Sequence, residues 1–313
     1  MKIVVVGAGA VGAYFGGRLA QHGEDVTFLV RQPTAEVLER QGLRVESIRG
    51  DFLIPHPKFA CDAEAIGAAA IVLVAVKAWQ VAAVARQIKP LVGPGTYVIP
   101  MQNGIDAGPA LTAVLGERPV MGGMCRILSH QVEKGWIRHT GSEPDIHFGP
   151  FDGRHCQPLF DLQQRFEKAG VVAKVHDDIS SVLWRKFLFV VTLGSVGSLI
   201  RAPIGIVRGH PETRELLLTC LRENHALARA HGVLLPDESI GETMNFIDGL
   251  PPAGISSMQR DLAAGRPSEL EAWTGAVVRR GREKGVPTPL HHLIYHCLLP
   301  FEKQAQGELT FPE

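Results

Sequence analysis

The sequence predicts an α/β protein in which a doubly wound parallel sheet is followed by an all-helical second domain. A run of β-branched residues near the N-terminus leads directly into a glycine-rich turn, and further apolar runs alternate with helical patterns as far as about residue 175. Beyond that point only helical periodicity continues. At 313 residues the chain is long enough for about two domains, which we expect at residues 1–177 and 178–313.

The glycine-rich turn follows Ile3–Val6, four consecutive residues that suit a strand buried on both faces. Its sequence, G-A-G-A-V-G, matches G-x-G-x-x-G, in which the glycines permit a tight turn, approach of a pyrophosphate and close helix packing. Because the chain contains 34 glycines, a glycine-rich turn of an unrelated α/β protein is the alternative. The context, a strand before the turn and an amphipathic helix after it, favours a Rossmann-type domain. The expected cofactor-binding residues of this turn are Gly7, Ala8, Gly9, Ala10, Val11 and Gly12.

Arg31 stands at the end of the second expected strand, residues 25–30. An acidic residue at this place would accept hydrogen bonds from the ribose of NAD, whereas an arginine accommodates the 2′-phosphate of NADP. Arg31 therefore favours NADPH as cofactor, the alternative being a solvated surface arginine. The missing acid also counts against an adenosylmethionine-dependent methyltransferase.

The remaining elements are expected in order along the chain. Residues 43–60 alternate apolar and polar side chains and predict a small strand pair on the sheet. Apolar runs predict further strands at residues 70–76, 96–101, 119–125 and 171–175. Periodicity and Gly or Pro stops predict helices of the second domain at residues 179–200, 211–231, 236–247, 257–264, 268–284 and 289–304.

Lys77 and Asn103 follow the ends of two successive strands. Open parallel sheets bind ligands at the carboxyl ends of their strands, so both side chains are expected near the cofactor and substrate. The alternatives are a surface lysine and an ordinary Asn-Gly turn.

Composition excludes several classes of partner. Lys plus Arg equals Asp plus Glu at 32 each, so no global field attracts nucleic acid or an anionic membrane. The five cysteines lack any C-x-x-C pattern, which indicates reduced thiols in a cytoplasm. The first strand leaves no room for a cleavable signal, and no apolar run is judged long enough for a membrane span. A small-molecule substrate is expected, without nucleic-acid or membrane partners.

Two residues of the second domain are candidates for the chemistry. Reduction of a carbonyl needs a hydride donor and a proton donor beside the developing alkoxide. Lys186 lies within an apolar helix at the domain junction, where desolvation would lower a lysine pKa toward the range of a general acid. A lysine that snorkels at the helix edge is the alternative. Glu269 lies in the expected first turn of a helix, where a carboxylate complements the dipole, and the residues alone favour this structural explanation.

Taken together, the motifs resemble those of the ketopantoate reductase (2-dehydropantoate 2-reductase) family. The landmarks are G-A-G-A-V-G at 7–12, V-K-A-W-Q at 76–80, Q-N-G at 102–104, W-R-K at 184–186, S-S-M at 256–258 and G-R-P-S-E at 265–269. The resemblance implies NADPH-dependent reduction of a 2-oxo acid in a cleft between a Rossmann domain and a helical domain, and a homodimer is compatible with it. It implies Lys186 as general acid and Glu269 as the residue that orients the substrate. It further implies substrate contacts from Ser257 and Asn103 and cofactor contacts from Arg31, Lys77 and Asn103.

The chain departs from the family pattern beside the expected acid. Family members resemble W-R-K-x-x-x-N-x-x-x-N, but Val190 and Gly194 stand at the two asparagine positions, and Thr274 replaces a further asparagine. Positions four and eight residues after Lys186 share its helix face, so we expect a more apolar and roomier pocket there. A different 2-oxo acid or a bulkier ketone is therefore an alternative substrate, and a non-catalytic dinucleotide sensor is a further alternative.

One pair of histidines and one pair of aspartates are interpreted as structural. His292 and His296 have the spacing of metal ligands but lack an H-E-x-x-H motif, so a helix-face pair is expected and no metal. Asp177 and Asp178 are interpreted as a helix start.

Overall fold

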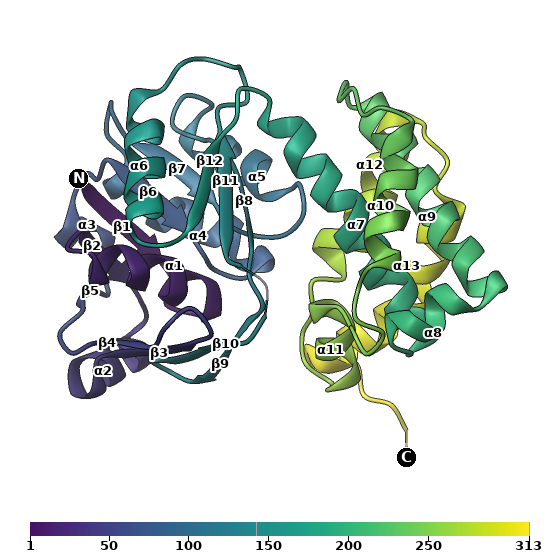
Figure 1. The fold of residues 1–313 in the computed structure, drawn as a ribbon, viewed down its shortest axis with the longest axis horizontal. Helices are drawn as coiled ribbons and strands as arrows, with labels where there is room; N and C mark the ends of the chain where they lie inside the picture. The colour runs from purple at the N-terminus through teal and green to yellow at the C-terminus, as the bar shows by residue number, and fades with distance from the viewer. Residues whose placement is uncertain (142, 313) are drawn as a thin grey trace. The chain divides into compact units, whose positions relative to one another are not determined.

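The computed structural model describes residues 1–141 and 143–312, and the chain forms two compact units (Figure 1). The first unit contains residues 1–102 and 107–179, and the second contains residues 103–106 and those from 180 onward. The short segment 103–106 thus packs with the helical unit although it is flanked in sequence by the sheet unit. No pattern in the sequence predicted that residues 103–106 would pack with the helical unit.

The first unit is built on a five-stranded sheet with the order β5-β2-β1-β6-β7. Its strands are β1 (Lys2–Val6), β2 (Asp25–Leu29), β5 (Lys58–Ala60), β6 (Ile71–Val74) and β7 (Tyr97–Pro100). All its pairings are parallel, and β1 is central, with Val4 paired to Thr27 on one side and to Val72 on the other. The N-terminal run of β-branched residues therefore forms the middle of the sheet.

Alternate residues of β1 enter two separate apolar clusters, because successive side chains of a strand point to opposite faces. Ile3 and Val5 pack in one cluster, while Val4 and Val6 pack in the other. The first cluster includes side chains of helices α1 (Ala10–Gln21) and α6 (Gln157–Lys168), and the second includes those of α4 (Val81–Gln87) and α5 (Ala107–Leu115). Helices thus cover both faces, and the prediction of a doubly wound parallel sheet is confirmed.

Two expected strand assignments were right only in part. Within 43–60, β3 (Leu43–Ser47) and β4 (Phe52–Ile54) pair in a second sheet, β4-β3-β10-β9, whereas β5 joins the main sheet. Within 119–125, Val120 makes a parallel bridge to Val98 of β7, but β8 (Gly122–Arg126) lies in a third sheet, where it runs antiparallel to β11. Period-2 alternation identifies a strand but not its partner. The other strands of these sheets are β9 (Ser129–Glu133), β10 (Trp136–His139), β11 (Asp145–Gly149) and β12 (Val172–Val175).

Short helical segments connect the strands of the first unit. They are α2 (Gln32–Gln41), α3 (Ala63–Ile66), η1 (Ala78–Gln80) and η2 (Lys89–Leu91).

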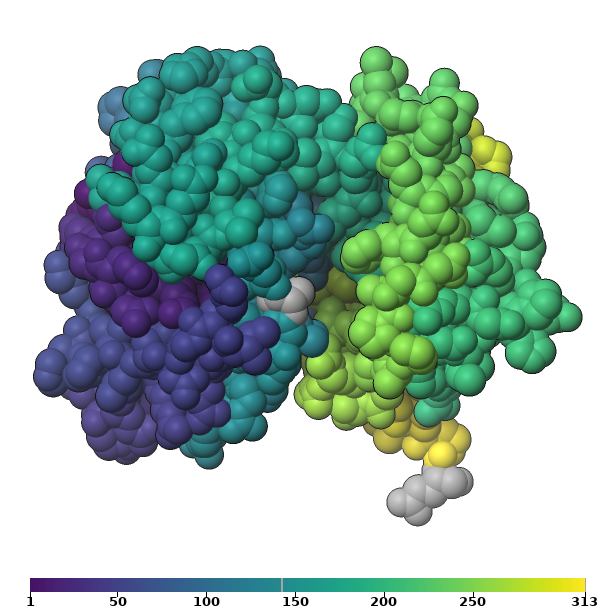
Figure 2. Space-filling view, in the orientation of Figure 1, coloured from purple at the N-terminus to yellow at the C-terminus, as the bar shows by residue number. Residues whose placement is uncertain are grey.

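The second unit is helical, as predicted, and is coloured from green to yellow over most of its surface in Figure 2. Its helices are α7 (Ile179–Ile200), α8 (Ile204–Gly209), α9 (Pro211–Ala230), α10 (Glu238–Asp248), α11 (Ser257–Ala263), α12 (Ala276–Lys284) and α13 (Pro289–Ala305). A π-helical turn, η3 (Glu271–Gly275), precedes α12. Glu269 therefore lies before this turn and not in the first turn of an α-helix, contrary to the expectation.

The expectation that no apolar run is long enough for a membrane span was wrong for helix α7. It has 22 residues and a window of mean hydropathy 1.4, so it qualifies by length and composition. Within the described protein, however, 61% of that window is buried, as in the core helix of a folded domain. Its apolar residues are accounted for by the core of the second unit, where Phe187, Leu188 and Val191 are fully or almost fully buried.

Candidate active site

The glycine-rich turn joins β1 to α1 and has the geometry that a dinucleotide requires. Gly7 has φ +94°, a left-handed conformation that favours glycine. A β-carbon at Gly12 would lie 2.1 Å from the carbonyl oxygen of Gly7 and 2.9 Å from Cβ of Ala75, so only glycine fits there. At Gly9 the corresponding space is open, with no atom within 4 Å.

The N-terminus of α1 lies beside this open space. Gly9 is its N-cap residue, and no side chain caps the helix. Its first N–H groups are therefore oriented as in helices that bind anions. The turn therefore fits the pyrophosphate of a nicotinamide dinucleotide, because it leaves open space at Gly9 and offers backbone N–H groups as hydrogen-bond donors.

Arg31 lies just beyond β2, at the same edge of the sheet as the glycine-rich turn. Leu29 pairs with Val6, so the two strands end side by side. Arg31 is exposed and is the N-cap residue of α2, with its carbonyl oxygen accepting the N–H groups of Thr34 and Ala35. Among the described residues its guanidinium makes no ion pair, which leaves it accessible to a phosphate.

Lys77 begins the turn η1 after β6, and it is exposed. Its Nζ lies 5.6 Å from the centre of the Trp79 ring. Gln102 closes the same sheet edge from β7: its amide donates to the carbonyl oxygens of Val74 at 2.9 Å and Val76 at 2.7 Å. Gln102 is 7% exposed, and its Oε1 is buried without a partner in the described structure. Gln102 is part of the Q-N-G motif, but no sequence pattern predicted that its amide would join β6 and β7.

Asn103 is half-buried and belongs to the helical unit. The adjacent Gly104, with φ +101°, passes close to the π-helical turn, because a β-carbon there would lie 3.2 Å from the carbonyl oxygen of Ala272 and 3.8 Å from Cδ1 of Trp273. Asp106 ends the segment with hydrogen bonds to α12, described below.

Lys186 lies on α7 and is half-buried. Its neighbours along the helix, Trp184 and Phe187, are 6% and 1% exposed. The next residue on its helix face, Val190, is also buried, so the lysine is flanked by apolar residues of α7. By contrast, Arg185 is exposed and pairs with Glu242 at 2.8 Å.

Glu269 is half-buried and lies two residues before η3. Its carbonyl oxygen accepts the N–H of Trp273 at 3.0 Å. The turn is fastened to α7 by a hydrogen bond of 2.8 Å between the hydroxyls of Thr274 and Ser195, both fully buried. π-Helical turns are frequent at functional sites, where they place side chains that a regular helix would not.

Ser257 is the half-buried first residue of α11. The preceding residue, Ser256, caps this helix by accepting the N–H of Gln259 at 3.0 Å. The first S of S-S-M is thus structural, and the hydroxyl of the second is not required for the cap.

The space beside Gly194 is filled, and the expectation of a roomier pocket was wrong at this position. A β-carbon at Gly194 would lie 2.8 Å from Cε3 and Cζ3 of Trp273 and 3.3 Å from Cε of Met258. The indole, 2% exposed, occupies the volume that a longer side chain on α7 would need. The expectation of apolar surroundings agrees with these neighbours. The sequence signal was present in Trp273, next to the substituted Thr274, but it was not used.

Trp273 connects the parts of the second unit that carry the predicted site residues. Its ring lies beside Gly104 on one side and beside Gly194 of α7 on the other, and its backbone N–H donates to the carbonyl oxygen of Glu269. The structure thus brings the Asn103 segment, the Lys186 helix and the Glu269 segment around one indole.

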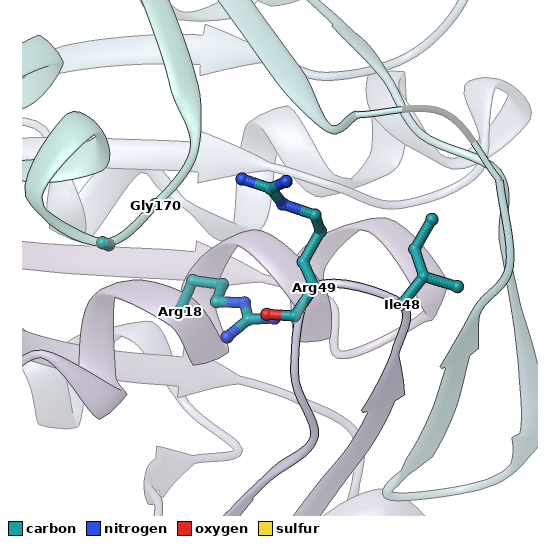
Figure 3. Close-up of a pocket in the computed structure, with 5 residues that line it drawn as sticks. Arg18, Ile48, Arg49 and Gly170 are labelled. Carbon is teal, nitrogen blue, oxygen red and sulfur yellow. The ribbon is translucent and has the colours of Figure 1, made fainter.

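A surface cavity of about 340 Å³ in the first unit contains none of the predicted site residues (Figure 3). It is lined by Arg18, Ile48, Arg49, Ala169 and Gly170. Arg18 donates to the carbonyl oxygens of Arg49 at 3.2 Å and Gly50 at 2.8 Å, which ties α1 to the β3–β4 turn. This arginine is therefore explained by the fold.

Comparisons with known proteins agree with the motifs. Two family models match the chain: ketopantoate reductase PanE/ApbA over residues 3–153, and its C-terminal model over residues 178–302. The uncharacterized oxidoreductase YkpB of Bacillus subtilis is 30% identical over 97% of this chain and 100% of its own length.

Solved structures show the same architecture. A 2-dehydropantoate 2-reductase from Geobacter metallireducens has a TM-score of 0.87 and 30% identity, covering 97% of this chain and 100% of its own. A D-mandelate dehydrogenase solved with NADH and anilino(oxo)acetate shares the fold, with a TM-score of 0.87 at 19% identity over 98% of this chain and 99% of its own. The chain belongs to the ketopantoate reductase family and is an oxidoreductase that acts on the C=O/CH–OH pair.

Proposed function

We propose that this protein uses NADPH to reduce a 2-oxo acid to the 2-hydroxy acid, with ketopantoate as first candidate substrate, in cytoplasmic pantothenate biosynthesis. The observation that carries the proposal is the arrangement of the second unit. Lys186 projects from an apolar face of α7, and the Asn103 and Glu269 segments both pack onto that helix through Trp273. A proton donor and two polar side chains are thereby held on one scaffold.

In the proposed reaction, bound NADPH supplies a hydride to the carbonyl carbon of the substrate. Negative charge then develops on the former carbonyl oxygen, and Lys186 donates the Nζ proton to it. Glu269 orients the substrate and the lysine, while Ser257 and Asn103 bind polar groups of the 2-oxo acid. The glycine-rich turn, Lys77 and Arg31 would hold the cofactor, and the guanidinium of Arg31 would bind its 2′-phosphate.

The experiment is steady-state kinetics on purified protein, with NADPH consumption followed for ketopantoate and for a panel of other 2-oxo acids. Lys186→Ala should lower kcat by at least about a hundredfold, the range typical of a lost general acid, with NADPH binding retained. Arg185→Ala, which removes the exposed neighbouring charge, is the matched control and should keep near-normal turnover. Unchanged turnover of Lys186→Ala would exclude the acid role, and an inert wild type that binds NADPH would favour the sensor.

A second candidate is reduction of a different 2-oxo acid that carries an apolar substituent. The favouring observation is the face of α7 that follows Lys186, which presents Val190 and the Trp273-covered Gly194 instead of amide side chains. Apolar walls discriminate weakly between substrates that differ by a methylene, whereas a hydrogen-bonding site rejects analogues strongly. Turnover of ketopantoate no better than that of unrelated 2-oxo acids would favour this candidate.

A further inference from the structure

The residue before Glu269 is held by a buried carboxylate from the far end of the chain. Ser268, 3% exposed, donates its N–H to Oε1 and Oε2 of Glu302 at 3.0 and 3.1 Å and its hydroxyl to Oε2 at 2.5 Å. Glu302 lies on α13 and is itself 3% exposed. The Ser268 hydroxyl also accepts the N–H of Leu270 at 3.2 Å. Ser268 thus bonds directly to the carboxylate, and Leu270 is linked to it through the Ser268 hydroxyl.

Burial of this carboxylate needs a reason, because a charge removed from water is costly unless it is well paired. In the described part of the chain no cation forms an ion pair with Glu302. Its remaining donor is the amide of Gln306, at 2.7 Å from Oε1. Neutral donors therefore surround the group. An apolar residue at 302 would allow α13 to pack without the free-energy cost of burying a charge. It could not, however, accept the hydrogen bonds that the N–H and hydroxyl of Ser268 donate.

We propose that Glu302 is a positioning residue for the reductase reaction, which fixes through Ser268 the backbone from which Glu269 projects. The other side of Glu269 is fixed independently, by the hydrogen bond from Trp273 and by the Thr274–Ser195 pair that fastens η3 to α7. The segment is therefore restrained from both directions. The proposal rests on the proposed role of Glu269 in orienting substrate.

The chain contains a matched control on α9, a second buried carboxylate that holds α13. Glu223, 8% exposed, accepts the N–H groups of Leu290 at 2.8 Å and His291 at 3.1 Å, and also contacts Nδ1 of His291 at 2.5 Å. This carboxylate fastens the first turn of α13, whereas Glu302 fastens its last part to Ser268. Loss of either weakens the docking of α13, but only Glu302 holds the segment that leads to Glu269.

The experiment compares Glu302→Gln, Ser268→Ala, Ser268→Thr and Glu223→Gln in the full chain, with NADPH and ketopantoate. Glu302→Gln and Ser268→Ala should lower kcat about tenfold or more with the KM for NADPH unchanged, since small misplacements of reacting groups are costly. Ser268→Thr keeps both donors and should restore kcat. Glu223→Gln should lower Tm at least as much as Glu302→Gln while keeping kcat within about twofold.

Equal kcat for Glu302→Gln and Glu223→Gln, or Ser268→Thr no better than Ser268→Ala, would overturn the positioning role. The failure of the proposed function is distinguishable. If Lys186→Ala and Glu269→Gln keep wild-type turnover, the catalytic assignment fails; if both lose turnover while Glu302→Gln keeps it, only the positioning role fails.

Discussion

The indole of Trp273 occupies the space into which a side chain at Gly194 would extend, with two ring carbons 2.8 Å from the β-carbon position. These residues are 79 apart in sequence and lie on η3 and α7. The glycine at 194 is thus a packing requirement of the tryptophan. The loss of a family asparagine at 194 and the presence of Trp273 are two parts of one structural arrangement.

Gly194→Asn should therefore destabilise the protein by about 1–3 kcal/mol, the usual cost of overpacking. Chemical denaturation measures the effect. The matched control is Gly241→Ala on α10, where no atom lies within 4 Å of the β-carbon, and this variant should be stabilising by about 0.5–1 kcal/mol. Adding Trp273→Leu to Gly194→Asn should recover part of the loss, because contacting residues are coupled. Strict additivity would contradict the packing argument.

Arg31→Asp should shift cofactor preference toward NADH. Arg31 is exposed at the sheet edge where β2 ends, and a lost hydrogen bond to a charged phosphate is worth a roughly ten- to hundredfold change in kcat/KM with NADPH. Arg40→Asp, at the other end of α2, makes the same change in net charge away from the turn and should leave the preference unchanged. A wild type that already prefers NADH would show that Arg31 does not bind the phosphate.

His147 and His176 form a half-buried pair in the first unit that predicts a loss of stability in acid. Their ring nitrogens lie 2.7 Å apart and the rings are stacked. Burial, opposed by Asp145, lowers the pKa of His147 from 6.5 to about 4. Burial and Lys174 lower the pKa of His176 as well. Both imidazoles are therefore neutral in the folded protein at neutral pH.

Between pH 6.5 and about 4 the unfolded chain binds a proton at His147 that the folded chain does not, so acid favours unfolding. The free energy of unfolding should be highest above pH 6.5 and fall by at most about 3 kcal/mol through His147 as the pH approaches 4. Urea titrations at several pH values measure this slope. His147→Gln should flatten it, and His130→Gln, on the exposed strand β9, should not. An unchanged slope in His147→Gln would exclude the pair as its source.

The sequence predicted best where local sterics determine the structure. The glycines at 7 and 12 are required by a positive φ and by a 2.1 Å approach to backbone, and the run Ile71–Val74 is wholly apolar because both of its faces are buried. The role of Lys186 stays a prediction, which the sequence suggests because a lysine stands out against an apolar helix.

Long-range partners could not be predicted in this way. Ser268 and Glu302 are 34 residues apart, and neither has a pattern that names the other. The transfer of Asn103 to the helical unit depends on Gly104 passing close to Ala272 and Trp273, and no period of 2 or 3.6 encodes such a contact. The partners of the strands in 43–60 could not be predicted either, because alternating apolar and polar residues are compatible with pairing to any neighbouring strand.

Asp106 holds the Asn103 segment to α12, although 174 residues separate it from Arg280. Its Oδ1 accepts Nε and Nη2 of Arg280 at 2.8 and 2.6 Å, and its Oδ2 accepts Nη2 of Arg279 at 2.8 Å. Asp106 and Arg280 are half-buried, so the pair is less screened than a fully exposed one. The carboxylate thus restrains the segment three residues after Asn103.

Asp106→Asn should raise the KM for the 2-oxo acid several-fold, because a loosened Asn103 must be ordered when substrate binds. The KM for NADPH should change less. Asp248→Asn is the matched control, since Asp248 forms a two-bond pair with Arg214 at 2.6 and 2.7 Å in the same unit, away from Asn103. Each variant should lose no more than about 1 kcal/mol of stability, as partly exposed pairs do. If both variants change the KM for the 2-oxo acid equally, Asp106 acts on global stability and not on the position of Asn103.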